Sequence, residues 1–124
     1  MISDQEKYLN LATQKRDGSF VNTPVWFAQA GLENIYFVFS LNNAGKVKRI
    51  RNFSGVKVAP CTFKGKLTAS WQEASATLVD DEETINRARC HFRNKYGLTM
   101  RVSDFFSRLV GNYQRRQYIV INLE

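Results

Sequence analysis

Short runs of apolar residues, separated by turn-forming residues, fill most of the chain. The run Ile-Tyr-Phe-Val-Phe at 35–39 is continuous, which is typical of a strand covered on both faces. The dipeptide Asp17-Gly18 between two such runs is a strong hairpin signal. These patterns predict strands at residues 9–15, 20–28, 35–39, 56–63, 67–79 and 117–123.

Helical patterns are fewer. The strongest begins at Asp80, with Glu83 three residues later in capping-box spacing, and ends at Gly97. Shorter helical segments are expected at 4–9, 46–53 and 103–110. Because strands and helices do not alternate, the pattern predicts a mostly β fold with flanking helices. A closed or nearly closed antiparallel barrel would remove the edges of so many short strands.

The composition is that of an ordinary globular protein, with 44% hydrophobic and 23% charged residues. A chain of 124 residues predicts a single domain, 1–124. Residues 1–7 are polar, and no apolar run is long enough to span a bilayer, so a cytoplasmic protein without membrane contact is expected. His91 and Cys90 are too few for a zinc site, and no metal is predicted.

The net charge of +7 is concentrated most clearly in the segment 45–51. Four of the six residues from Lys46 to Arg51 are basic, and they follow a predicted buried strand, Ser40 and a glycine. A serine hydroxyl, helix amides and nearby lysines favour a phosphate. A solvated basic helix face is the alternative interpretation.

Both prolines of the chain lie inside strand-like runs. Proline cannot donate a hydrogen bond to a sheet ladder, so Pro24 and Pro60 predict strand edges or bulges. Backbone groups near them could then meet a ligand, and the neighbouring Trp26 offers a flat apolar surface. An ordinary barrel corner would explain either proline equally well.

No catalytic set is recognisable, and the catalytic residues are unknown. Nucleophile–base arrangements and glycine-rich phosphate loops do not occur, and the acids from Asp80 to Glu83 are explained by the helix start. The basic charge leaves a nucleic-acid-binding barrel as a minor alternative. The expectation is a small-molecule ligand and no nucleic acid.

Four segments resemble, in order, the pyridoxamine 5'-phosphate oxidase-like split-barrel proteins, and most closely their coenzyme F-420-dependent branch. They are RDGSFVNTPVWF at 16–27, GKVKRIRN at 45–52, VAPC at 58–61 and WQEA at 71–74. The chain has Ala-Ser-Trp at 69–71, where that branch usually has Gly-Pro-Trp. The resemblance implies a six-stranded split β-barrel that forms a homodimer, with FMN or the deazaflavin F-420 at the subunit interface.

The resemblance also assigns residues to the cofactor phosphate. Carried over by position, Ser40, Lys46 and Lys48 would hold this group. Arg49 matches another basic position of the pattern.

The flat ring of the cofactor would be lined by Thr23, Val25 and Trp26. Pro60 and Cys61 would lie near it on another strand. Arg116 receives no role. The implied activity is hydride transfer between the cofactor and an unknown small organic substrate. In such enzymes the cofactor carries the chemistry, which would explain the missing acid and base. A non-catalytic protein that carries a flavin or heme is the alternative.

Overall fold

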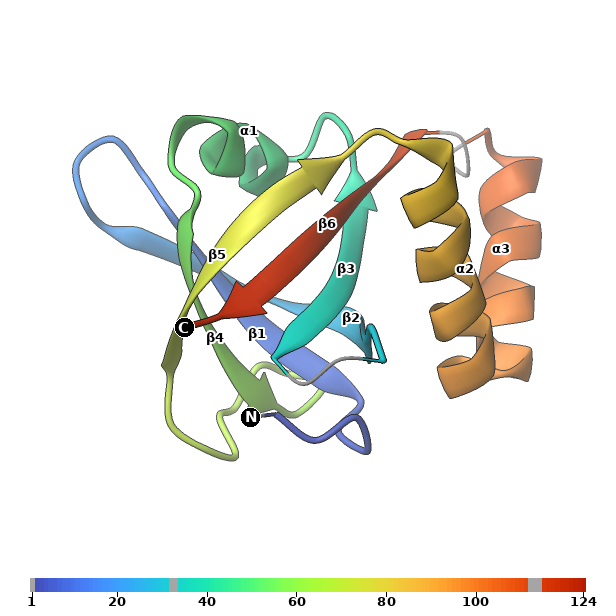
Figure 1. Ribbon diagram of the computed structural model, residues 1–124, viewed down its shortest axis with the longest axis horizontal. Helices are drawn as coiled ribbons and strands as arrows, with labels where there is room; N and C mark the ends of the chain where they lie inside the picture. Colours follow the sequence, from blue (N-terminus) through green and yellow to red (C-terminus); the bar gives the residue numbers. More distant parts are fainter. Residues whose placement is uncertain (1, 32–33, 112–114) are drawn as a thin grey trace.

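A computed structural model describes residues 2–31, 34–111 and 115–124 of the chain. Six antiparallel strands close into a barrel in the order β1-β2-β3-β6-β5-β4 (Figure 1). The strands are β1 (Tyr8–Gln14), β2 (Phe20–Gln29), β3 (Ile35–Leu41), β4 (Gly55–Cys61), β5 (Gln72–Val79) and β6 (Arg116–Leu123). The predicted mostly β antiparallel barrel is confirmed.

The barrel interior is filled by apolar side chains from every strand. Leu9 and Leu11 of β1 and Ile119 and Ile121 of β6 are fully buried there, two residues apart on each strand. This spacing follows from the alternation of side chains between the two faces of a strand. Tyr36 also lies in this core, and its hydroxyl donates to the carbonyl of Ile2 at 2.7 Å, which fixes the segment before β1.

Helix α1 (Gly45–Asn52) connects β3 to β4 and lies at one end of the barrel (Figure 1). Val47 and Ile50, three residues apart, are its buried side chains, as the sequence predicts. Ile50 is part of the barrel core. Of the basic residues of α1, Lys48 and Arg51 are exposed, whereas Lys46 and Arg49 are half-buried.

Helices α2 (Glu82–Tyr96) and α3 (Leu98–Leu109) lie side by side against one side of the barrel (Figure 1). Gly97 joins them with a φ of +55°, a conformation that favours glycine. A second core, between these helices and the barrel, includes Phe37, Phe92 and Met100. None of the helices in the described part of the chain is both long and apolar enough to cross a bilayer.

The cap of α2 differs from the sequence prediction by one residue. Asp81, and not Asp80, is the N-cap, and its Oδ2 accepts a hydrogen bond from the amide of Thr84 at 2.9 Å. A hydrogen bond from the Thr84 side chain, and then this backbone bond, lower the pKa of the Asp81 carboxyl. Thr84 stands three residues after the cap, where a cap side chain reaches the first unpaired amides.

Three further boundaries differ from the prediction. Residues 4–9 form a turn and the start of β1, because Tyr8 pairs with both Trp26 and Cys61. Residues 67–71 lie outside β5 and make only one bridge, between Leu67 and Cys61. Helix α3 begins at Leu98 instead of residue 103.

Candidate functional site

The closed barrel has a local opening between β2 and β3, because the ladder between these two strands is short. In the described pairing β3 contacts only the segment Phe27–Gln29 of β2, so the earlier part of β2, with Pro24, pairs with β1 alone. Pro60 likewise lies beyond the β4–β5 ladder, which ends at Val58. The predicted strand edge is confirmed for Pro24. Pro60 does not lie at a free edge, because its carbonyl accepts the amide of Thr68 at 2.9 Å and the next residue, Cys61, bridges to Leu67.

A pocket of about 430 Å³ lies at this opening. Its volume falls within the range of roughly 300–1,000 Å³ that small-molecule sites occupy. Four of the nine sequence-predicted cofactor residues line it, namely Val25, Trp26, Ser40 and Lys46. The other lining residues are Pro24, Phe39, Leu41, Ser103, Ser107 and Arg116.

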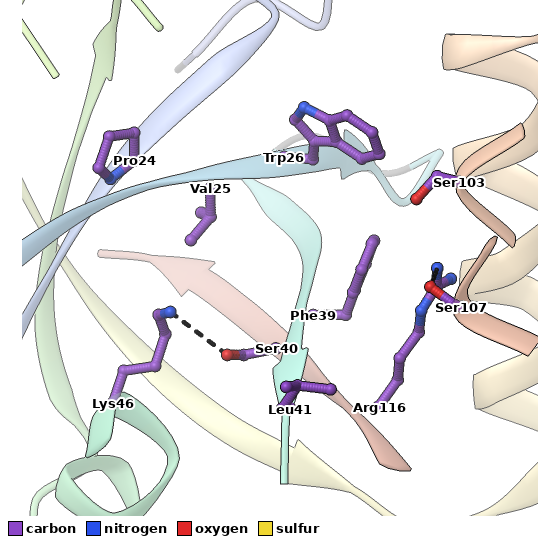
Figure 2. Close-up of a pocket in the computed structure, with 10 residues that line it drawn as sticks. All are labelled: Pro24, Val25, Trp26, Phe39, Ser40, Leu41, Lys46, Ser103, Ser107 and Arg116. Atoms are coloured by element: carbon purple, nitrogen blue, oxygen red, sulfur yellow. Dashed lines mark hydrogen bonds between the residues drawn. The ribbon is translucent and has the colours of Figure 1, made fainter. Parts of the chain in front are cut away.

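One end of the pocket carries a half-buried cation. Lys46 extends from α1, and its Nζ donates to the Ser40 Oγ at 3.3 Å (Figure 2). Burial, with a smaller contribution from the charge of Arg49, lowers the pKa of the Lys46 ammonium. Ser40 is the residue next to the end of β3, so its hydroxyl is held by the sheet. An ammonium and a hydroxyl in this position suit a phosphate group.

The other end of the pocket is aromatic. The rings of Trp26 and Phe39 meet edge to face, with centroids 6.4 Å apart. Trp26 also stacks on Tyr96 of α2, with centroids 5.1 Å apart. Val25 points toward Lys46 while Trp26 lies on the other side of β2 (Figure 2). The pocket thus runs through the opening from the Lys46–Ser40 pair to the rings of Trp26 and Phe39.

Arg116 closes the pocket on the side of α3. Its guanidinium donates to Asp104 Oδ1 at 2.8 Å and to Ser107 Oγ at 2.9 Å, and it lies 4.5 Å from the ring centroid of Phe39. The Arg116 and Asp104 side chains are only 5% and 11% exposed. Sequence analysis assigned no role to Arg116, because its position opposite Leu41 depends on the register of β3 with β6.

The predicted basic residues beyond Lys46 lie outside this pocket. Lys48 is exposed on α1. The Nε of Arg49 donates to the Oγ1 of Thr13 at 2.7 Å, which directs that guanidinium toward β1. A cofactor role for either residue stays a prediction.

Some of the residues predicted to contact the cofactor ring also lie outside the pocket. Thr23 precedes the lining residues of β2 and does not line the pocket. Pro60 and Cys61 are buried in β4, which is separated from β2 by the whole of β1. Burial, and then the charge of Glu6, raises the pKa of the Cys61 thiol. These three cofactor contacts stay predictions.

The lining residues indicate binding chemistry more than proton transfer. The described lining has two basic side chains and three serine hydroxyls, without a carboxylate, histidine or thiol. No three His, Cys, Asp or Glu side chains gather into a metal-binding group in the ranges that the structure covers. The site can hold an anion and a flat ring, and any redox chemistry would come from a bound group.

No protein-family model matches the sequence, and no curated protein is significantly similar to it. Solved structures do match. HutZ, the heme storage protein from Vibrio cholerae, has a TM-score of 0.69 at 16% identity, over 96% of this chain and 82% of its own. A pyridoxamine 5'-phosphate oxidase-related, FMN-binding protein from Nostoc punctiforme has a TM-score of 0.61 at 16% identity, over 94% and 70% of the two chains.

An F420 reductase has a TM-score of 0.57 at 13% identity, over 98% of this chain and 89% of its own. The fold is the split barrel of the pyridoxamine 5'-phosphate oxidase-like proteins. The fold that the sequence resemblance implied is therefore confirmed. At identities this low, the similarity establishes the fold alone.

Proposed function

We propose that the protein is an oxidoreductase that binds a phosphorylated flavin-type cofactor, FMN or F-420, in the pocket between β2 and β3. It would transfer a hydride between this cofactor and a small organic substrate. The observation that carries the proposal is the pairing of Lys46 and Ser40 at one end of a pocket whose other end is aromatic. An FMN-binding protein and an F420 reductase among the similar folds support it.

The residues of the pocket fit such a cofactor. The Lys46 ammonium would neutralise the phosphate, and the Ser40 hydroxyl would donate to a phosphate oxygen. Trp26 and Phe39 would contact the ring, beside the part of β2 that has a strand neighbour on one side only. A bound flavin-type group supplies hydride chemistry itself, so the pocket needs no acid or base of its own.

We further propose that the protein acts as a homodimer. The exposed large apolar side chains are concentrated around α3, where Leu98, Phe105, Phe106 and Leu109 are each more than half exposed. Apolar surface of this extent is typical of interaction sites. Sedimentation velocity should give the mass of two chains at micromolar concentration, and a single-chain mass would contradict this part of the proposal.

The cofactor proposal is tested by mixing the purified protein with FMN or F-420, removing free ligand and recording the absorption spectrum. One bound cofactor per chain, with micromolar or better affinity, is expected for at least one of them. Loss of both cofactors on repurification from correctly folded protein would contradict the proposal.

A carrier that holds its cofactor without turnover is the second candidate. It is favoured by the pocket lining without acid or base, and by the fold shared with a heme storage protein. For heme, however, the described lining offers no histidine, cysteine, methionine or tyrosine as an axial ligand. Reduced cofactor on the protein should pass a hydride to some acceptor of a broad panel if the protein is an enzyme, and to none if it is a carrier.

A further inference from the structure

A groove with a volume of about 410 Å³ is lined by residues of both α2 and α3. These two helices lie side by side against the barrel (Figure 1). The lining residues are Arg93 from α2 and Arg101, Asp104, Phe105 and Arg108 from α3. They share no member with the lining of the proposed cofactor pocket. The groove is therefore a second candidate site, and its walls combine three arginines with an aromatic ring.

Positive charge in this groove exceeds negative charge. Asp104 is the one carboxylate among the described lining residues, and both of its oxygens already have a basic partner. Its Oδ1 accepts from the Arg116 guanidinium at 2.8 Å, and its Oδ2 lies 3.6 Å from the Nε of Arg93. Part of its charge is thus neutralised by Arg116, from outside the groove. The three lining arginines share what remains, and such an excess of positive charge attracts anions.

The arginines of the groove are accessible to a ligand. Arg101 and Arg108 are exposed, and the Arg93 side chain is 45% exposed although it lies near Asp104. Among the described residues, the Arg101 side chain has no ion-pair partner. A guanidinium donates pairs of hydrogen bonds to phosphate oxygens. Arg101 can therefore bind a phosphate without breaking an ion pair of the described structure.

Phe105 lies between the two arginines of α3. Arg101 precedes it by four residues and Arg108 follows it by three, and residues at these spacings are neighbours on one face of a helix. Phe105 is 63% exposed, and its ring meets that of Phe106 edge to face, with centroids 5.7 Å apart. Arg101 and Arg108 are about 10.5 Å apart along the helix axis. A ligand that uses the ring and both arginines needs a flat group and an extended chain of negative charges.

We propose that this groove binds a nucleoside di- or triphosphate, which has both of these parts. Its base would stack on Phe105, and its phosphate chain would pair with Arg101 and the neighbouring arginines. The site is independent of the proposed cofactor and of the proposed reaction. Leu98, Phe106 and Leu109 do not line the groove, so they remain available to the proposed dimer.

ATP, tripolyphosphate and adenosine test the two parts of the site in cofactor-free protein. Isothermal titration calorimetry at about 0.15 M salt limits the long-range attraction of a generally basic surface. ATP is expected to bind at least tenfold more tightly than tripolyphosphate, which has the charge alone, and than adenosine, which has the ring alone. Equal affinities for ATP and tripolyphosphate would indicate a non-specific basic surface. That result, or no binding of ATP, would overturn the proposal.

Single substitutions then test each contact. Arg101→Gln should weaken ATP binding at least fivefold, whereas Arg16→Gln, which removes the same charge from the exposed turn between β1 and β2, should leave it unchanged. Phe105→Leu should lower the affinity for ATP to that for tripolyphosphate. Both groove positions are exposed, so the melting temperature of each variant should stay close to that of the wild type. Unchanged ATP affinity in Arg101→Gln would overturn the proposal.

ATP also carries a phosphate and a flat ring, so its binding must be distinguished from binding in the cofactor pocket. Lys46→Met removes the ammonium of that pocket and should leave ATP affinity unchanged. Loss of ATP binding in Lys46→Met would place the nucleotide in the cofactor pocket and overturn the proposal.

Discussion

The Lys46 side chain combines an unfavourably buried charge with a position that suits an anionic ligand. Its ammonium is half-buried at the end of the pocket, with the Ser40 hydroxyl as its hydrogen-bond partner. Burial without a counter-charge disfavours the charged form, which is why its pKa is lowered. A bound phosphate would reverse this by supplying the missing negative charge. The charged form of Lys46 would therefore be more stable with a phosphate bound than in the unliganded protein.

This lowered pKa predicts a pH dependence of cofactor affinity. Only the protonated Lys46 attracts a phosphate, and it loses its proton at lower pH than an ordinary lysine with a pKa near 10.5. FMN affinity should therefore fall as the pH rises from 7.5 toward 10. Riboflavin, which lacks the phosphate, should show a flat profile in the same fluorescence titration. A fall in FMN affinity that persists in Lys46→Met would refute this assignment.

The sequence predicted the residues of the pocket that are close together in the chain. Ser40 and Lys46 are six residues apart, and a strand end followed by a helix places them together. Arg116 could not be found in this way, because it reaches the pocket only through the pairing of β6 with β3. The same holds for Pro60, whose distance from the pocket follows from β1 lying between β2 and β4.

At the scale of the element, the start of α2 offers a direct test. Asp81→Ala removes the acceptor of the Thr84 amide and should lower the melting temperature by a few degrees. Asp80→Ala removes the same charge one residue earlier, where no cap bond is made, and should change it little. Thermal unfolding followed by circular dichroism measures both. Equal effects of the two substitutions would show that the cap is misassigned.

The contact between α3 and β6 depends on a buried ion pair. Asp104→Ala leaves the Arg116 guanidinium enclosed without its carboxylate, and it should cost about 3 kcal/mol of unfolding free energy. Ser107→Ala removes a neutral partner of the same guanidinium and should cost about 1 kcal/mol. Urea denaturation measures both values. A cost for Asp104→Ala no larger than that for Ser107→Ala would contradict the assigned role.

Strands were predicted better than helix boundaries, for a physical reason. A strand such as 35–39 carries its own signal in a continuous apolar run. Residues 67–71 have a strand-like composition, but β4 pairs with β5 only from Gly55 to Val58. The strand predicted from composition was therefore too long at its start. The first turn of α3 was missed because it begins directly after Gly97, the residue at which the preceding helix was predicted to end.

At the scale of the whole molecule, closure of the barrel was predictable and the strand order was not. Many short strands with hairpin links favour a closed sheet, whatever their order, because closure removes the exposed strand edges. The neighbours β3 and β6 are separated by most of the chain, and their pairing leaves β2 joined to β3 over only three residues. This opening positions the pocket. The proposed cofactor site therefore depends both on the short β2–β3 ladder and on Lys46.

The most direct measurement of that account compares cofactors with and without phosphate. FMN is titrated against riboflavin, and F-420 against its dephosphorylated analogue, in the wild-type protein and in Lys46→Met, with Lys64→Met as the exposed-lysine control. For at least one pair, the account predicts roughly tenfold or greater preference for the phosphorylated form in the wild type and in the control. In Lys46→Met that preference should nearly vanish. A preference that survives Lys46→Met, or one that is missing in the wild-type protein, would contradict the account.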